Sequence, residues 1–199
     1  AARFRVDADR AAFLAAHGLL RLTLSAHAAA APGAWRFAAD ATGKPFLLDP
    51  PRDLRFSLSH TRGAAAVAVA EACDVGVDVE AAQQRAADMA VAENFFAPDE
   101  ISELRAAEGP VRRDQFFALW VVKEAVVKAT GEGLSQPLDS FSVALSPLRV
   151  TMRGAAAAEG WSLFHTQRDG FHLAAAARCA DAAFAVDWVD VAALLQAAG

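Results

Sequence analysis

Hydrophobic and polar positions alternate with a period of two in several short segments. The clearest is the run Val75–Glu80, in which every second residue is a valine. In a strand, this period places the valines on one face and Gly76, Asp78 and Glu80 on the other. Similar runs predict further strands at 54–60, 64–72, 140–146, 160–167 and 170–178, and a hairpin around the turn 41–45.

Apolar residues three or four positions apart predict helices in other parts of the chain. The first is expected from Arg3 to Leu24, and three more near 85–96, 98–107 and 114–130. Asp114 is a candidate N-cap of the last helix, and Gly131 and Gly133 are expected to end it.

The order of these elements predicts an α+β fold with two pseudo-duplicate lobes. Each lobe is expected to pack a helix on a small, mostly antiparallel sheet, with the active site at the lobe interface. Residues 1–73 would form the N-terminal lobe and residues 74–199 the C-terminal lobe.

Composition and charge narrow the function classes. The 199 residues are 55% hydrophobic, which is ample for a core, and the formal net charge of −5 argues against a general nucleic-acid binder. The chain has neither an apolar run of about 18 residues nor a signal-peptide pattern, so we expect a cytoplasmic protein without a membrane span. Cys73 and Cys179 lie outside any metal-binding pattern, which predicts two buried free thiols.

The predicted helix 114–130 carries four residues of chemical interest. Trp120, Lys123, Glu124 and Lys128 occupy positions i, i+3, i+4 and i+8 and are expected to share one helix face. Taken alone, Glu124 and Lys128 are an ordinary ion pair worth about 0.2–0.5 kcal/mol, and Trp120 is a core residue.

Three carboxylates together point to a metal. Asp78 and Glu80 on the strand and Glu124 on a facing helix would supply the oxygen ligands that Mg²⁺ prefers, with Mn²⁺ as the alternative. Gly76 would leave room for a phosphate. Lys123 and Lys128 would neutralise a leaving group, while Glu124 or a metal-bound water would act as the base. These residues predict a metal-dependent phosphotransferase.

The same residues resemble a known family, the surfactin-synthetase-activating type of 4′-phosphopantetheinyl transferase. The resemblance rests on "GVDVE" at 76–80 and "WVVKEAVVK" at 120–128. Further blocks agree in order between Arg3 and Arg178, namely "RFRVDADR", "TGKPF", "FSLSH", "NFFAPDE" and "GEGLSQPLDSFSV". "NFFAPDE" would place Glu100 near the site. The family usually has an additional first strand ahead of the "RF" block, which this sequence lacks.

The resemblance implies a specific reaction. Coenzyme A would bind in the cleft between two lobes, with Mg²⁺ bridging Asp78, Glu80, Glu124 and the pyrophosphate. The serine hydroxyl of an apo acyl or peptidyl carrier protein would attack the β-phosphate, giving the holo carrier and adenosine 3′,5′-bisphosphate. This is the activity of a holo-(acyl-carrier-protein) synthase or 4′-phosphopantetheinyl transferase, here expected to be a monomer. The residues implied in holding the coenzyme are Arg10, Lys44, Ser59, His60, Asp78, Lys123 and Lys128.

Alternatives remain at this point. The same carboxylates would serve a metal-dependent phosphohydrolase of a nucleotide coenzyme, and the same fold a non-catalytic module that binds coenzyme A or carrier proteins. Taken one at a time, these residues also have ordinary structural explanations. Lys44 would be a solvated charge in a turn, and Ser59 and His60 would be structural residues at the end of a strand. Arg112 and Arg113 form either a basic docking patch for an acidic carrier protein or a solvated charge pair.

Overall fold

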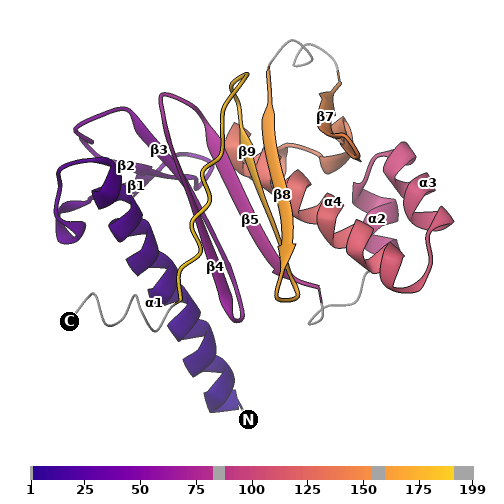
Figure 1. Ribbon diagram of the computed structural model, residues 1–199, viewed down its shortest axis with the longest axis horizontal. Helices are drawn as coiled ribbons and strands as arrows, with labels where there is room; N and C mark the ends of the chain where they lie inside the picture. The colour runs from indigo at the N-terminus through magenta and orange to yellow at the C-terminus, as the bar shows by residue number, and fades with distance from the viewer. Residues whose placement is uncertain (1, 83–87, 154–159, 191–199) are drawn as a thin grey trace.

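The computed structural model describes residues 2–82, 88–153 and 160–190, and the side chains of all these except residues 2–11 and Leu134. The long helix α1 (Ala2–His27) lies at one end of the molecule, the longer strands lie in the middle, and α4 with α2 and α3 lies at the other end (Figure 1). None of the described helices has both the length and the apolar character needed to cross a bilayer.

The first half of the fold runs from α1 to β4. Two hairpins follow the helix, formed by β1 (Phe37–Ala39) with β2 (Pro45–Leu47) and by β3 (Leu54–Thr61) with β4 (Ala64–Glu71). Leu20 and Leu24 lie one helical turn apart and pack on Trp35, Leu54 and Phe56, so α1 covers one side of this half. The predicted helix, the hairpin expected around 41–45 and the strands expected at 54–60 and 64–72 are confirmed.

The second half begins with β5 (Val75–Ala81). Three helices follow, α2 (Met89–Phe95), α3 (Pro98–Ala106) and α4 (Gly109–Thr130). Two antiparallel units follow α4, the hairpin of β6 (Phe141–Leu145) with β7 (Leu148–Met152) and the pair β8 (Ser162–Arg168) and β9 (Phe171–Ala177). Since β9 also pairs with β5, the sheet order is β5-β9-β8.

The predicted α+β class with antiparallel sheets is confirmed, with one helix start corrected and one strand added. Helix α4 begins at Gly109, five residues before the expected cap Asp114, because Pro110 in its first turn has a backbone suited to a helix start. Strand β7 was not expected from the sequence. The predicted lobe boundary falls in the short turn between β4 and β5.

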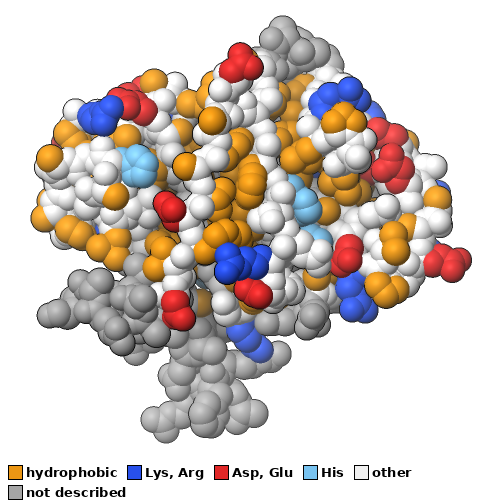
Figure 2. Space-filling model, in the orientation of Figure 1, with side chains coloured by type: hydrophobic (Ala, Val, Ile, Leu, Met, Phe, Trp, Pro, Cys, Tyr) orange, Lys and Arg blue, Asp and Glu red, His pale blue; other side chains and the backbone are white. Residues whose placement is uncertain are grey.

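Both faces of β5 are covered. The valine face packs on Ala66, Ala175 and Phe184, the last in the segment that follows β9. That segment crosses the middle strands in Figure 1, where hydrophobic side chains gather on the surface (Figure 2). Helix α4 covers the other face, so Asp78 is only 5% exposed.

Gly76 explains how α4 can lie so close to β5. A Cβ atom at this position would collide with the carbonyl oxygen of Ala125 and lie 2.5 Å from the amide nitrogen of Ala129. The glycine therefore accommodates the backbone of the helix. The expectation that Gly76 leaves room for a phosphate is wrong.

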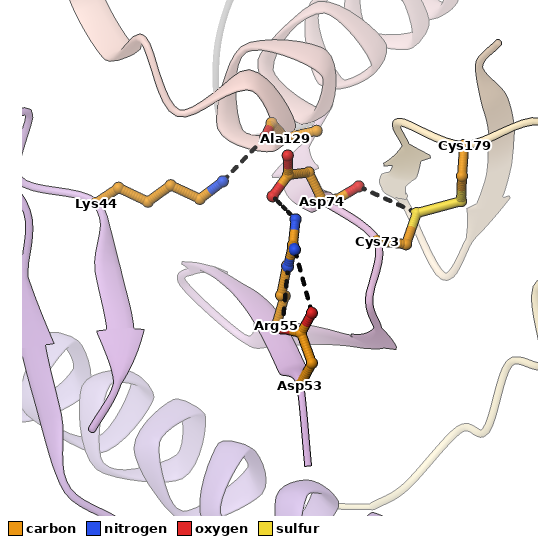
Figure 3. Close-up of polar contacts among 7 residues, drawn as sticks. All are labelled: Lys44, Asp53, Arg55, Cys73, Asp74, Ala129 and Cys179. Atoms are coloured by element: carbon orange, nitrogen blue, oxygen red, sulfur yellow. Dashed lines mark hydrogen bonds and ion pairs between the residues drawn. A yellow bond between two sulfur atoms is a disulfide. The ribbon is translucent and has the colours of Figure 1, made fainter. Parts of the chain in front are cut away.

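Cys73 and Cys179 form a disulfide, so the expectation of two free thiols is wrong as well (Figure 3). The sheet register explains the pairing. Val75 lies opposite Ala177, and the amide of Arg178 donates to the carbonyl of Asp74, so the two cysteines just beyond these residues face each other with their Cα atoms 6.2 Å apart. A sequence separation of 106 residues concealed this proximity.

Candidate active site

A cavity of about 760 Å³ lies between the two halves of the fold. The first half contributes the turn 42–45 and the strand segment 56–58, and the second half contributes α2, α4 and the loop 131–139. The residues that line it are Thr42, Gly43, Lys44, Pro45, Phe56, Ser57, Leu58, Asn94, Phe95, Trp120, Glu124, Val127, Lys128, Gly131, Gly133, Gln136, Pro137, Leu138 and Asp139. Four of these, Lys44, Trp120, Glu124 and Lys128, were singled out in the sequence.

Helix α4 presents Glu124 and Lys128 to this cavity from successive turns, because residues four apart share a helix face. Burial raises the pKa of Glu124, and the nearby charges of Asp78 and Glu80 raise it further, while Lys128 opposes the change. The three carboxylates therefore lie within electrostatic reach of one another. Helix α4 and strand β5 bring them together.

Asp78 has two carboxylate oxygens that differ in their hydrogen bonding. Its Oδ1 accepts hydrogen bonds from Lys128 Nζ at 2.6 Å and from Ser59 Oγ at 2.7 Å. Its Oδ2 is buried without a hydrogen-bond partner among the described residues. A buried carboxylate oxygen is costly when it has no partner, so this atom is a natural ligand for a cation.

The carboxylate set fits a hard divalent cation in its chemistry, because Asp78 has an unpartnered oxygen among the described residues and both Asp78 and Glu80 are close enough to Glu124 to raise its pKa. Within the described residues, no three His, Cys, Asp or Glu side chains are already gathered as a metal cluster. A site shared by Asp78, Glu80 and Glu124 would need their side chains to converge. It stays a prediction.

Lys123 does not share the face of Glu124 and Lys128. Five helical residues separate the two lysines, which turns their side chains apart by roughly 140°. Lys123 is fully buried, forms an ion pair with Glu100 Oε2 at 2.9 Å, and donates to the backbone oxygens of Leu138 and Phe141. Neither Lys123 nor Glu100 lines the cavity, so the expected position of both at the site is corrected.

Lys44 reaches from the first half to the end of α4. Its Nζ donates to the carbonyl oxygen of Ala129 at 2.9 Å (Figure 3). Beside it, Thr42 Oγ1 donates to the carbonyl oxygen of Gly131 at 2.8 Å. Cations are favoured at a helix C-terminus, where carbonyl groups lack partners. Burial lowers the pKa of Lys44, an effect that Asp74 partly offsets. These two contacts, here called the inter-lobe latch, hold the turn 41–45 against α4.

Arg55 joins the two halves beside this latch. It forms ion pairs with Asp74 at the start of the second half and with Asp53, and Asp74 adjoins the disulfide at Cys73 (Figure 3). A smaller cavity of about 400 Å³ lies here and shares Lys44 with the larger one.

The other residues implied in coenzyme binding lie elsewhere. Ser59 is buried beside Asp78, while His60 is exposed with its ring edge-on to Phe13 at 6.3 Å, and neither lines the cavity. The side chain of Arg10 lies outside the described residues. Sequence reasoning did not name Ser57 or Phe95, although both lie in the quoted blocks "FSLSH" and "NFFAPDE".

Residues 74–177 match the family model described as the 4′-phosphopantetheinyl transferase superfamily. The 4′-phosphopantetheinyl transferase HetI of Nostoc sp. is 34% identical over 177 residues, which cover 88% of this chain and 73% of HetI. The 4′-phosphopantetheinyl transferase Sfp of Bacillus subtilis is 37% identical over 110 residues, which cover 55% of this chain and 47% of Sfp. The chain therefore spans less than half of Sfp's own length.

Among solved structures, a holo-(acyl-carrier-protein) synthase of Bacillus anthracis in complex with CoA matches with a TM-score of 0.46 and 14% sequence identity. The match covers 54% of this chain and 96% of that chain.

Proposed function

Because the chain belongs to the 4′-phosphopantetheinyl transferase superfamily, we propose that it transfers the 4′-phosphopantetheine arm of coenzyme A to a serine hydroxyl of an apo acyl or peptidyl carrier protein. One observation of the structure supports this function most directly. Glu124 and Lys128 line a cavity between the two halves, and Lys128 is paired with Asp78 behind this wall. Asp78 keeps one buried oxygen without a hydrogen-bond partner among the described residues. This combination suits the binding of a pyrophosphate and a cation.

The reaction exchanges one P–O bond for another. The serine oxygen forms a bond to the β-phosphorus of coenzyme A, the bond from that phosphorus to the bridging oxygen breaks, and adenosine 3′,5′-bisphosphate leaves. Catalysis then depends on positioning and on charge stabilisation. Lys128 supplies a positive charge beside the cavity, which would stabilise the leaving phosphate.

Glu124 is the proposed base. Because burial and two neighbouring acids raise its pKa, its carboxylate accepts a proton more readily than an exposed glutamate does. A divalent cation held by Asp78, Glu80 and Glu124 would add positive charge at the pyrophosphate, with Mg²⁺ proposed and Mn²⁺ as the alternative. Arg10, Lys44, Ser59 and His60 stay predicted coenzyme contacts, and Lys123 is assigned to the core instead.

The carrier protein is proposed to dock near the start of α4. Arg113 and Val111 are exposed there, and Phe95 is exposed at the cavity rim on α2. Arg112 holds the carbonyl oxygen of Ala107 and so fixes this helix start. An acidic carrier would be steered to such a patch in spite of the overall negative charge. The enzyme is proposed to work as a cytoplasmic monomer.

The test is a carrier-labelling assay. The protein is incubated with Mg²⁺, coenzyme A and apo carrier proteins of fatty-acid, polyketide and peptide synthesis, and each carrier is weighed by mass spectrometry. We expect at least one carrier to gain one phosphopantetheine arm, and the preferred carrier will separate holo-(acyl-carrier-protein) synthase activity from broader transferase activity. Asp78→Asn and Glu124→Gln should abolish the gain, whereas Glu103→Gln on the exposed face of α3 should not.

The assay also separates the alternatives. Release of adenosine 3′,5′-bisphosphate without a carrier, at a rate that a carrier does not change, would replace the proposal with a phosphohydrolase. Coenzyme binding without any turnover would replace it with a binding module.

A further inference from the structure

Two serines join the halves of the fold between β3 and β5. The amide of Val77 donates to Ser57 Oγ at 3.0 Å, and the amide of Val79 donates to Ser59 Oγ at 3.4 Å. The residue numbers rise together, so the two strands run side by side in the same direction. In the part of the chain that the structure describes, β3 and β5 belong to separate sheets, and these hydroxyls take the place of ladder carbonyls.

The two serines are alike except in one contact. Both are buried, at 6% and 8% exposure, and both lie on the same face of β3 because they are two residues apart. Only Ser59 also donates to a carboxylate, Asp78 Oδ1, at 2.7 Å. Its single proton is thereby used, and its oxygen accepts from Val79, so the hydroxyl is satisfied by the protein itself.

Asp78 Oδ1 is held from two directions. Lys128 Nζ approaches it from α4 and Ser59 Oγ from β3. Lys128 is a flexible side chain with 31% of its surface exposed, whereas Ser59 is short, buried and fixed to a strand. The serine is therefore the more rigid of the two partners, and rotation of the carboxylate would break both contacts.

We propose that Ser59 is a positioning residue that holds Asp78 Oδ1 so that Oδ2, which has no partner among the described residues, faces a divalent cation. This inference rests on the proposed function and assigns Ser59 a role different from the predicted contact with the coenzyme. Groups that orient a metal ligand in this way typically contribute about 10- to 100-fold to metal affinity.

The test compares Ser59→Ala with Ser57→Ala. The second variant is a matched control, because it removes the same kind of buried bridge to a β5 amide without touching Asp78. Mn²⁺ binding to each full-length protein is measured by electron paramagnetic resonance without coenzyme A. We expect Ser59→Ala to weaken Mn²⁺ binding by about 10-fold or more, and Ser57→Ala to leave it unchanged. Each variant loses a hydrogen bond to a β5 amide, so both should unfold at a lower urea concentration than the wild type.

A second variant protects the test against a folding defect. Ser59→Cys keeps the side-chain shape but donates a weaker hydrogen bond, so it should also weaken Mn²⁺ binding. In transfer assays, Ser59→Ala should raise the Mg²⁺ concentration needed for half-maximal rate, while the KM for coenzyme A at saturating Mg²⁺ stays unchanged.

Three results would overturn the inference. The first is equal Mn²⁺ affinity in the wild type and in both alanine variants. The second is a raised KM for coenzyme A with unchanged Mn²⁺ affinity, which would make Ser59 a coenzyme contact. The third is a wild-type protein that binds no Mn²⁺. Failure of the proposed transferase function would appear separately, as a carrier protein that gains no mass in the labelling assay. The Mn²⁺ affinities of the wild type and the two alanine variants would still test the role of Ser59.

Discussion

The ion pair between Lys123 and Glu100 is expected to stabilise the second half without taking part in chemistry. Both side chains are at most 1% exposed, and burial lowers the pKa of Lys123 and raises that of Glu100, while their mutual attraction opposes both changes. Lys123→Met would leave the glutamate buried with only the amides of Ala97 and Val143 as donors. We expect a loss of about 3–5 kcal/mol in unfolding free energy.

The assay is urea unfolding followed by circular dichroism, together with the melting temperature. A loss of about 3–5 kcal/mol corresponds to a melting temperature lower by roughly 6–20 °C for a domain of this size. Lys123→Met combined with Glu100→Gln should recover most of the loss, since no buried charge is then left unpaired.

Lys128→Met is the matched control. Lys128 also forms an ion pair with a buried acid, but it is partly exposed at the cavity, so the change should lower activity far more than stability. The reasoning about Lys123 is refuted if Lys123→Met unfolds like the wild type and instead raises the KM for coenzyme A. That result would return Lys123 to the coenzyme site.

Three further predictions concern packing, the disulfide and pH. Gly76→Ala should lower the unfolding free energy by about 1–3 kcal/mol, measured in urea, because its Cβ meets the backbone of α4. Cys73→Ser should lose up to about 5 kcal/mol, measured without reductant, because Cys73 and Cys179 close a loop of roughly 100 residues in the unfolded chain. Burial lowers the pKa of His165 and of His172 below the ordinary value of 6.5, with Asp114 opposing the change at His172, so the folded chain binds these protons at a lower pH than the unfolded chain does. As the pH falls below 6.5, the unfolded chain is protonated first, so the free energy of unfolding decreases; above 6.5 this contribution to stability is complete. Urea unfolding at several pH values measures this dependence.

Each of these predictions has a result that contradicts it. Gly18→Ala is the control for Gly76, because a Cβ there meets nothing within 4 Å and should stabilise α1 by up to about 1 kcal/mol. Equal effects of the two alanines would exclude the clash. A wild-type protein whose stability does not respond to reductant would contradict the disulfide prediction. Unchanged pH dependence in His165→Gln would contradict the third.

The sequence predicted elements better than it predicted their surroundings. The valine alternation at 75–80 and the apolar spacing of α4 are local patterns, and both elements were found where expected. The sequence predicted a facing helix that carries Glu124, but how closely that helix approaches β5 depends on packing between segments distant in the sequence. The role of Gly76 was therefore out of reach.

The candidate site was predicted in part for the same reason. Spacing along one helix correctly placed Glu124 and Lys128 together, because residues four apart share a face. The prediction that Lys123 shares this face was wrong, because Lys123 lies roughly 140° from Lys128 around the helix. The partner of Lys123 is Glu100 on another helix, and no pattern in the sequence joins these two residues.

The inter-lobe latch gives coenzyme binding an entry cost. Lys44 donates a hydrogen bond to the carbonyl oxygen of Ala129 in this structure. In the proposed complex with coenzyme A, the same ammonium group would contact a phosphate instead. Affinity measured for the coenzyme would then understate the strength of its contacts, since each binding event must first release the latch. Thr42→Val, which weakens the latch at Gly131 but keeps Lys44, should lower the Kd for coenzyme A in calorimetry. A raised Kd would mean that the closed arrangement of the two halves is itself the form that binds.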